Sequence, residues 1–369
     1  MGNRCVIKYD LIVVGAGIVG AACADCATAE GLSVLLLDPG PIGGAVTAAS
    51  MGHLVSVDGL PAELALASYS QRQWETLRHL PDIEYDRCGT LWVASDDQDC
   101  ARIPPKRERL AKAGVTAVPV DAKELYELEP SLAPGLPGGL LVADEGVVYP
   151  PAVARQLVKR ACRRGATLRR ARVATVGDHE VKLDDGSRVA GTVLVASGCS
   201  LPELLPELPL RLRKGHLVIT ERYPGMVRHQ LVQMHYTDTA HGEIDDVAFN
   251  VQPRPTGQIL IGSSREYGSN TTEVSLPMVQ RMLRCAFAFV PGLRQLDALR
   301  IWAGLRPATA DGLPYIGRVA GRRGIWVAAG HEGLGITTAP GTARLLVDLL
   351  LRRQPAIDAH PYDPARMAA

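Results

Sequence analysis

The chain has 369 residues, enough to bury a full hydrophobic core and to divide into two domains. Its 40 basic and 39 acidic residues nearly cancel, so net charge offers no general attraction for nucleic acid or an anionic membrane surface. We therefore expect a small-molecule partner bound in a defined pocket.

The cysteines and the hydropathy of the chain bear on its compartment, on metal binding and on membrane spans. The eight cysteines are scattered, which favours reduced thiols in a cytoplasmic protein. Cys23 and Cys26 match C-x-x-C, but they lie inside an expected helix without a second pair at ligand spacing, so no metal site is predicted. No segment reaches the roughly 18 apolar residues of a membrane span, so no transmembrane segment is expected.

Residues 10–38 carry the pattern of a dinucleotide-binding βαβ unit. A buried strand over 10–14 leads through a glycine-rich turn into an alanine-rich helix that ends near Gly31, and a second strand over 33–37 finishes on Asp38. The glycines allow a tight turn, close approach of a pyrophosphate and close packing of helix on strand, while Asp38 is placed to accept from ribose hydroxyls. The turn reads Gly15, Ala16, Gly17, Ile18, Val19, Gly20.

Small residues then dominate 45–53, where backbone can run close to a flat ligand, and an ordinary surface loop is the alternative. An amphipathic helix is predicted over 61–80, a strand over 89–94, and helices over 106–113 and 122–128. The chain is expected to re-enter the first domain near 147–151. A helix over 152–164 and short strands over 167–176, 181–183 and around Val189 follow.

A further buried strand over 192–196 ends in Ser197 and Gly198, at the kind of strand end where nucleotides bind. Residues 214–296 alternate as strands at 216–220, 247–251 and 258–261 with a helix over 278–289, which predicts an antiparallel sheet in a separate layer. The last third returns to glycine-rich motifs at 302–307, 311–317 and 327–336. A helix over 340–351 follows them, and its N-terminus is a second candidate site for an anion.

Together, the N-terminal glycines with Asp38, the segments W-A-G-L-R-P and D-G-x-P-x-I-G, and the C-terminal A-G-H-x-x-x-G resemble the D-amino-acid oxidase or glycine oxidase family. The resemblance covers nearly the whole chain. It implies an α/β protein with a Rossmann-like FAD-binding domain and a second, antiparallel-sheet substrate domain. The expected FAD-binding segments are 1–80, 146–213 and 297–369, and the substrate-binding segments are 81–145 and 214–296.

The resemblance also implies which residues hold the flavin. The cofactor-binding residues expected are Gly15, Gly17, Ile18, Val19, Gly20, Asp38, Thr47, Ala48, Ala49, Met51, Gly52, His53, Val173, Ser197, Gly198, Gly304, Arg306, His331, Glu332, Gly333, Leu334, Gly335, Ile336 and Thr337. The cysteine that holds flavin covalently in sarcosine oxidases has no counterpart near Leu305 and Arg306, so the FAD is expected to be noncovalent.

The expected catalytic residues are Arg306, His53 and Asn250. The planar guanidinium of Arg306 suits a substrate carboxylate, the alternative being an arginine tied to an internal acid. His53 and His331 are candidates to face the flavin, or else structural histidines. Asn250 falls where a substrate-holding tyrosine lies in glycine oxidase, and Gly333 replaces a second arginine of that enzyme, so the substrate does not transfer from it.

Within the family the chain looks most like the beta subunits of bacterial D-hydroxyproline dehydrogenases, and the flavin subunits of hydrogen cyanide synthase and opine oxidase are similar. This implies oxidation of a D-amino or imino acid such as cis-4-hydroxy-D-proline, with electrons passed to companion electron-transfer subunits. A cytoplasmic location follows, with peripheral attachment to the inner membrane through a complex as a variant. An oxygen-using oxidase and a non-catalytic FAD-binding subunit are the alternatives.

Overall fold

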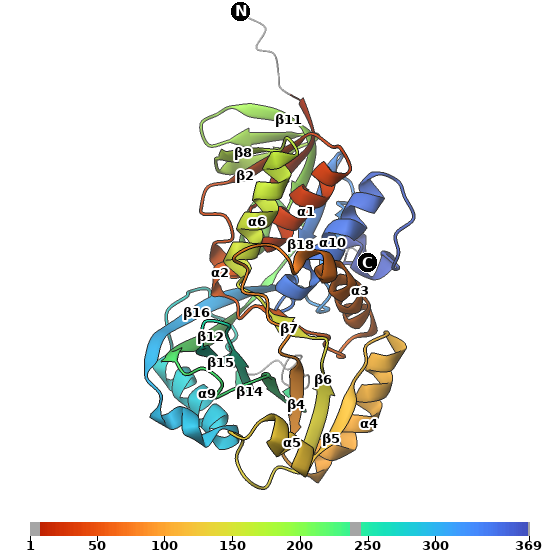
Figure 1. Ribbon diagram of the computed structural model, residues 1–369. Coiled ribbons are helices and arrows are strands. Elements are labelled where there is room, and N and C mark those ends of the chain that lie inside the picture. Colours follow the sequence, from red (N-terminus) through yellow and green to blue (C-terminus); the bar gives the residue numbers. More distant parts are fainter. Residues whose placement is uncertain (1–7, 237–244, 368–369) are drawn as a thin grey trace, which may run out of the picture.

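The structure is a computed structural model that describes residues 8–236 and 245–367. Two sheets, each with helices packed against it, form the two lobes visible in Figure 1. The glycine-rich N-terminal unit lies in the lobe drawn at the top. The predicted α/β class with a second, largely antiparallel sheet is confirmed.

The first sheet has the order β17-β18-β11-β1-β2-β8, and β9 and β10 extend it as an antiparallel branch from β11. The central strands β1, β2, β8, β11 and β18 pair in parallel. The strands are β1 (Lys8–Val14), β2 (Val34–Asp38), β8 (Thr167–Arg170), β9 (Val173–Gly177), β10 (Glu180–Leu183), β11 (Arg188–Val195), β17 (Tyr315–Arg318) and β18 (Ile325–Ala329).

The continuous apolar run of β1 is explained by burial on both faces. Leu11 and Val13 join the core formed with α1 (Ile18–Ala29), α6 (Pro150–Arg163) and α10 (Gly335–Leu350). Ile12 and Val14 face the opposite core, which includes β9, β10 and residues 201–208 around α7 (Leu201–Leu204). The helix α3 (Pro61–Leu77) packs on α10.

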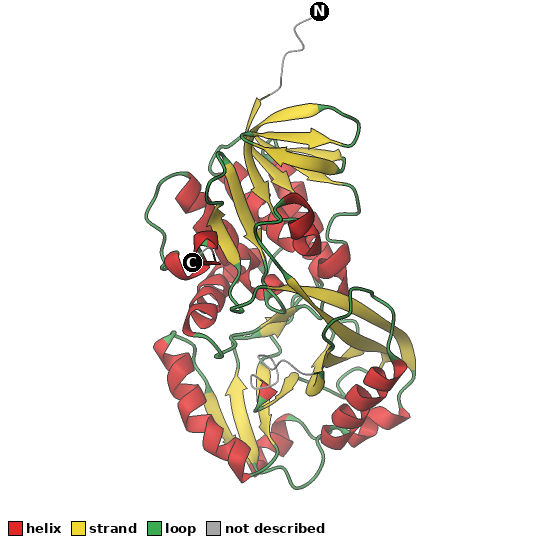
Figure 2. Ribbon diagram, turned by 180° about the vertical axis from the view of Figure 1, so that it is seen from behind, coloured by secondary structure: helices red, strands yellow, loops and turns green. Residues whose placement is uncertain are grey.

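The second sheet has the order β16-β12-β15-β14-β13-β4-β6-β5 and is antiparallel except for the β13–β4 pair. Figure 2 shows its strands and flanking helices from behind. The strands are β4 (Thr90–Ala94), β5 (Val118–Asp121), β6 (Gly138–Val142), β12 (Arg211–Arg222), β13 (Gln230–Gln233), β14 (Asp246–Pro253), β15 (Gln258–Arg265) and β16 (Ala298–Ala308). The helices are α4 (Asp97–Lys112), α5 (Ala122–Leu128) and α9 (Leu276–Phe289).

Short elements link the two lobes. The helix α2 (Ala45–Ala49) of the first lobe contacts β16 of the second sheet. Shortly after α2, β3 (His53–Leu54) pairs with β7 (Gly146–Val147) to form a separate two-stranded sheet. Four 3₁₀ turns complete the described chain, at Gly198–Ser200, Pro291–Gln295, His360–Tyr362 and Pro364–Met367.

Two of the predicted helix starts are wrong. The helix expected over 106–113 begins at Asp97 and contains Pro104 and Pro105, because the Asp96 carboxylate accepts from the Asp99 N–H and caps an earlier start. The helix expected from Pro340 begins at Gly335, and its burial against α1 and α3 offsets the hydrogen bond that Pro340 removes. Likewise, Val189 and residues 192–195 form one strand, β11, rather than two.

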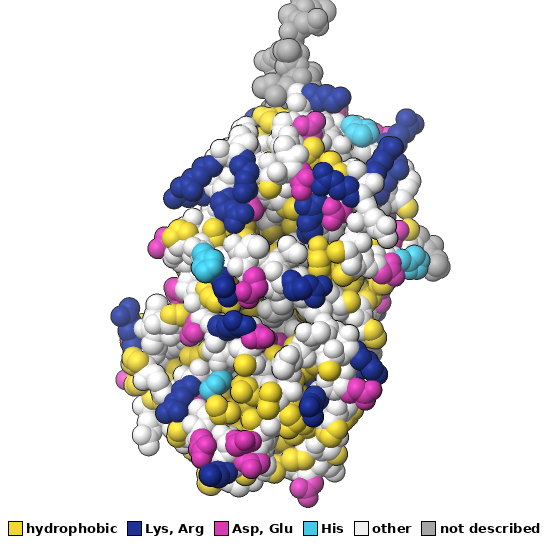
Figure 3. Space-filling model, turned by 45° about the vertical axis from the view of Figure 1, so that its right-hand side comes forward, with side chains coloured by type: hydrophobic (Ala, Val, Ile, Leu, Met, Phe, Trp, Pro, Cys, Tyr) yellow, Lys and Arg dark blue, Asp and Glu magenta, His cyan; other side chains and the backbone are white. Residues whose placement is uncertain are grey.

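The surface carries mixed charge on the face shown in Figure 3, where basic and acidic side chains are interspersed rather than segregated. Among residues 8–236 and 245–367, every helix is too short or too polar to serve as a membrane span. Of the cysteines, Cys5 lies outside the described residues, and the other seven are free thiols.

Candidate active site

The turn between β1 and α1 leaves room only for glycine. Gly15 has φ +110°, and a Cβ there would lie 2.4 Å from the Ala196 carbonyl oxygen. A Cβ on Gly20 would lie 1.9 Å from the Gly15 carbonyl oxygen. Gly17 is the N-cap of α1 and brings no capping side chain of its own, so backbone N–H groups of the first turn can form an anion site.

Asp38 and Thr47 shape this turn from two sides. The Asp38 carboxylate accepts from the N–H of Ala16 and of Gly40, both at 2.7 Å. The Thr47 hydroxyl accepts from the Ile18 N–H at 3.0 Å, immediately before Val19. Both side chains therefore hold the glycine turn in place.

The residues around the turn fit a dinucleotide. Ser197 follows β11 at the same sheet edge, and its buried hydroxyl has no hydrogen-bond partner within the described ranges. Gly198 beside it has φ +58°. Val173 is buried at the start of β9, and residue 171 is tied by its N–H to the Asp38 carbonyl oxygen at 3.2 Å. An unsatisfied hydroxyl at the switch between strands suits a ligand that can hydrogen-bond to it.

Residues 48–52 run from this turn to the second sheet. The Trp302 indole N–H donates to the Ala49 carbonyl at 3.1 Å, and a Cβ on Gly304 would lie 2.5 Å from the Ala49 Cβ. The Met51 carbonyl accepts from the Gln252 amide at 2.9 Å, while Gly52 has φ +93°. Ala48 lies in α2 within the same segment.

The glycine-rich segment before α10 meets these residues. The Glu332 N–H donates to the Pro307 carbonyl at 2.9 Å, and Thr337 donates its hydroxyl hydrogen to the His53 carbonyl at 3.0 Å. Leu334 is the N-cap of α10, followed by Gly335 and Ile336, and no side chain caps the helix. His331 pairs through Nε2 with the Thr342 hydroxyl at 3.1 Å, and burial lowers its pKa to about 4, so it is neutral near pH 7.

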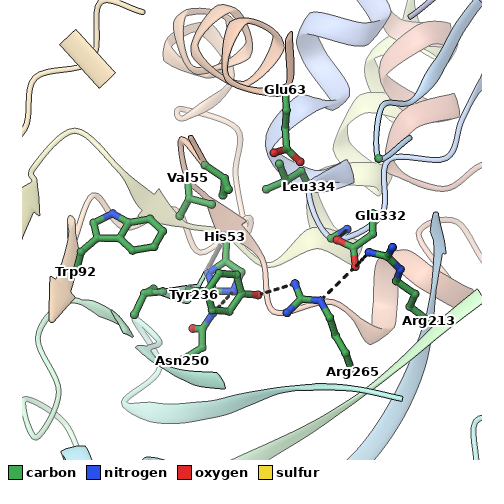
Figure 4. A pocket seen from close by; sticks show the side chains of 14 residues that line it. His53, Val55, Glu63, Trp92, Arg213, Tyr236, Asn250, Arg265, Glu332 and Leu334 are labelled. Atoms are coloured by element: carbon green, nitrogen blue, oxygen red, sulfur yellow. Dashed lines mark hydrogen bonds and ion pairs between the residues drawn. The ribbon is translucent and has the colours of Figure 1, made fainter. Parts of the chain in front are cut away.

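A pocket opens where this segment meets the second sheet (Figure 4). Its wall combines apolar side chains with several ionisable ones from both lobes. The lining residues are His53, Val55, Val57, Glu63, Trp92, Arg213, Val232, Tyr236, Asn250, Arg265, Gly312, Glu332, Gly333 and Leu334.

One end of the pocket is positively charged. The Glu332 Oε1 lies 3.7 Å from the Arg265 Nε and 4.0 Å from the Arg213 Nη1. Burial raises the pKa of Glu332, but the guanidiniums of Arg265, Arg306 and Arg213 outweigh it and lower that pKa overall, so Glu332 is ionised. Burial, followed by the charge of Glu332, raises the pKa of Glu63 to about 8, so Glu63 is mostly protonated near pH 7. The two lining arginines thus exceed the ionised carboxylates by one charge.

Tyr236 adds a phenol to this end. Its oxygen accepts from the Arg265 Nη2 at 3.3 Å, as Figure 4 shows. Burial raises the pKa of Tyr236, but Arg265 and Arg306 lower it further than burial raises it. The arrangement offers guanidinium donors and a phenol to an anionic ligand.

Arg306 lies beside the pocket but is not one of its lining residues. It pairs across the sheet with Arg213, and its Nη1 donates to the Ser264 carbonyl at 3.0 Å. Its guanidinium packs over Gly215, where a Cβ would come within 2.4 Å of Nη2, and its Cδ lies near Gly333. Whether Arg306 binds a carboxylate therefore stays a prediction.

His53 and Asn250 lie next to each other in the pocket wall, near Tyr236 (Figure 4). His53 Nδ1 lies 2.7 Å from the Gln230 Oε1, and the Asn250 Nδ2 lies 3.4 Å from the His53 Nε2. Burial lowers the pKa of His53 to about 4 despite the Gln230 hydrogen bond, so this imidazole is also neutral near pH 7.

Three pocket residues, Arg265, Tyr236 and Glu63, were not predicted from the sequence, and Arg213 had been given no role. Arg265 lies in β15, Glu63 in α3 and Arg213 in β12, while Tyr236 follows β13. They are distant in the sequence, so only the fold brings them together. The one available signal was a charged residue, Arg265, closing the otherwise uncharged run 258–264. In the same described ranges, no group of three metal-ligating side chains occurs.

The fold and this site define a protein of the dinucleotide-binding type, with a charged pocket set between the nucleotide lobe and a second sheet. The family model described as FAD dependent oxidoreductase, DAO, matches residues 10–349. The chain belongs to this family, and the prediction of FAD as cofactor is confirmed.

Named relatives agree over the full length. Glycine oxidase of Pseudomonas aeruginosa is 32% identical, with 96% of this chain and 98% of the relative covered. Hydrogen cyanide synthase subunit HcnC of the same organism is 27% identical over 97% of this chain and 96% of the relative. The crystal structure of glycine oxidase from Geobacillus kaustophilus superposes with a TM-score of 0.86 at 27% identity, covering 97% and 99% of the two chains.

Proposed function

We propose that this protein oxidises a D-amino or imino acid to the corresponding imine. The observation that carries the proposal is the positively charged end of the pocket, where Arg213 and Arg265 line the wall and Arg306 acts on the same Glu332 carboxylate. An α-carboxylate is the ligand that such a cluster suits. The family's dependence on FAD supplies the hydride acceptor.

In this proposal the chain's own residues bind and orient the substrate. The arginines hold the carboxylate, with Arg306 as the anchor, while His53 and Asn250 face the reacting end. A neutral amine can release its α-hydrogen as hydride without a strong base, because the nitrogen lone pair stabilises the forming iminium. Val55, Val57, Trp92 and Val232 line the pocket and limit water near the reacting carbon.

Our best candidate substrate is cis-4-hydroxy-D-proline, because the sequence looks most like those of D-hydroxyproline dehydrogenase beta subunits. We propose that electrons pass to companion subunits in a cytoplasmic complex, with attachment to the inner membrane as a variant. The relative HcnC is itself a subunit of hydrogen cyanide synthase, which supports an assembly. No lysine follows Lys214 in the sequence, so later strands offer no lysine for oxygen activation.

We also propose that the FAD is noncovalent, held by the glycine turn, Asp38, Ser197 and the segment 331–337. Denaturation should then release all flavin into the supernatant, whereas flavin that stays with precipitated protein would refute this. The division into 1–80, 146–213 and 297–369 against 81–145 and 214–296 is proposed on the same resemblance. Strand β16, within 297–369, pairs with β12 of the second sheet.

An oxygen-using glycine or D-amino-acid oxidase is the second candidate, favoured by the 32% identical glycine oxidase. Steady-state assays over a panel of D- and L-amino acids, glycine and cyclic imino acids test both. We expect dye reduction to exceed peroxide production, with cyclic D-imino acids preferred. Peroxide formation in air that equals dye reduction would instead assign an oxidase.

A further inference from the structure

A chain of hydrogen bonds runs from the interior of the second sheet to the pocket wall. Gln230 of β13 contacts His53, and His53 contacts Asn250 of β14, through the atoms and distances given above. Figure 4 shows His53 and Asn250 side by side at the pocket. Gln230 is fully buried and is not a lining residue.

The direction of every hydrogen bond in this chain is fixed from its buried end. The Gln230 Nε2 lies 2.9 Å from the Gly146 carbonyl and 3.1 Å from the Thr90 hydroxyl. A carbonyl oxygen can only accept, so the NH₂ group faces it and the Gln230 Oε1 faces His53. The His53 Nδ1 must therefore carry the hydrogen.

His53 passes this direction on to Asn250. The imidazole is neutral and protonated on Nδ1, so its Nε2 has a lone pair and accepts from the Asn250 NH₂ group. The Asn250 carbonyl oxygen is then turned away from His53. Although only 3% of Asn250 is exposed and the residue lines the pocket, Oδ1 has no hydrogen-bond partner in the described part of the chain.

A buried acceptor without a donor is costly, so this oxygen calls for a ligand that brings one. We propose that the Asn250 carbonyl oxygen accepts a hydrogen bond from the N–H of the substrate amine, and that His53 and Gln230 are positioning residues which fix its orientation. The inference rests on the proposed function. It selects primary and secondary amines and rejects amines without an N–H.

This contact also suits the reaction. When the Cα–H electron pair leaves as hydride, the nitrogen lone pair forms the C=N bond, and nitrogen gains positive charge. An N–H that donates to the Asn250 oxygen becomes a stronger donor as this charge develops, while the lone pair remains free. The hydrogen bond is therefore stronger in the transition state than in the bound amine.

Two flat, unreactive acids separate this contact from the rest of the site. Pyrrole-2-carboxylate carries an N–H beside its carboxylate, and furan-2-carboxylate carries an oxygen there. Binding of each to the FAD-loaded protein is followed by the change in flavin absorbance. In the wild type we expect the pyrrole acid to bind about 10-fold more tightly, the effect of one buried hydrogen bond.

Variants then assign the preference. Asn250→Leu removes the carbonyl at similar volume and should bring the ratio of the two dissociation constants close to one. Gln230→Met should do the same from outside the pocket, because His53 can then carry its hydrogen on Nε2 and reverse the Asn250 amide. The double variant should show no further loss. Gln233→Met, buried on the same strand but bonded to the Phe249 N–H, should keep the preference.

If Asn250→Leu still binds the pyrrole acid more tightly, the proposed contact with the Asn250 carbonyl is wrong. If the preference is lost in Asn250→Leu but kept in Gln230→Met, the contact stands, but Gln230 and His53 do not position it. Failure of both acids to bind overturns the inference. If the amino-acid panel still reduces the flavin in that case, the proposed function stands without it. If no amino acid reduces the flavin either, the proposed function falls as well.

Discussion

Arg213, Arg265 and Arg306 surround the carboxylate of Glu332, a residue whose backbone has φ +47° although it is not glycine. Residues other than glycine rarely adopt this backbone conformation, because it is energetically unfavourable. The attraction between the arginines and the ionised carboxylate offsets that cost. The internal acid that was the alternative partner for Arg306 is thus present. Substitution of Arg306 separates a role in stabilising the Glu332 charge from a role in binding a substrate carboxylate.

Replacing Arg306 with Ala removes one charge-assisted contact without altering the glycine turn. If Arg306 anchors the substrate, kcat/KM should fall by an amount equivalent to about 2–5 kcal/mol, and Arg306→Lys should recover part of it because an ammonium lacks the fork geometry. The measurement is kcat/KM with a dye acceptor, alongside flavin content. Full FAD content with near-normal kcat/KM would make Arg306 structural.

At the residue level, sequence motifs could identify side chains near glycines but not the pocket's charged wall. Arg306, His53 and Asn250 were named from a family pattern, and the structure places all three at or beside the pocket. Arg265 and Tyr236 belong to no local motif. Arg265 at the end of β15 and Tyr236 after β13 come together near the segment before α10 only through tertiary packing.

At the scale of elements, the β1–α1–β2 unit depends on Gly20, where a Cβ would overlap the Gly15 carbonyl oxygen. Gly20→Ala should therefore force helix and strand apart, lowering Tm and FAD content together. Gly177→Ala in the same sheet is the matched control, since its nearest neighbour would be 3.9 Å away. Equal Tm and FAD content in the two variants would show that the turn tolerates a side chain.

Elements with strong local signals were predictable, and those held by packing were not. The helix α5 matches its predicted range because Asp121 and Glu124 form a capping box. The predicted starts at 106 and 340 were too late, because Pro104 and Pro340 lie inside helices. The cap on α4 and the burial of α10 outweigh the hydrogen bonds that these prolines remove. The glycine turn between β1 and α1 could be predicted because its geometry depends on residues that are adjacent in the sequence.

At the scale of the whole molecule, the site depends on contacts between lobes that are distant in sequence. The Thr337 hydroxyl joins α10 to His53, and the buried Glu145 accepts from the Ser56 N–H beside the pocket-lining residues Val55 and Val57. The division into domains stays a prediction from the alternation of motifs. The position of the pocket could not be predicted, because it is set where these connections between the lobes cross.

Glu145 makes stability depend on pH in a defined direction. Burial raises its pKa to about 7, above the ordinary value of 4.5, so the folded state binds more protons than the unfolded state between these values. Its contribution is greatest in acid and is lost as the pH rises through 7. Relative to Glu145→Gln, the wild type should lose about 1–3 kcal/mol of unfolding free energy from pH 5 to pH 8.

Urea unfolding of the two proteins across this pH range measures the difference directly. Other groups, such as His53 and His331, titrate in both proteins and cancel in the comparison. Parallel pH profiles for wild type and Glu145→Gln would mean that Glu145 is ionised in the fold at neutral pH.

The central claim is that a carboxylated amine in this pocket gives its α-hydrogen to the bound flavin. The most direct test mixes FAD-loaded protein with cis-4-hydroxy-D-proline and the other panel amines without oxygen, and follows the visible absorbance of the flavin. The account predicts rapid bleaching by cyclic D-imino acids, slowed when the α-hydrogen is replaced by deuterium. Flavin that stays oxidised with every amine, as in a non-catalytic FAD-binding subunit, would contradict it.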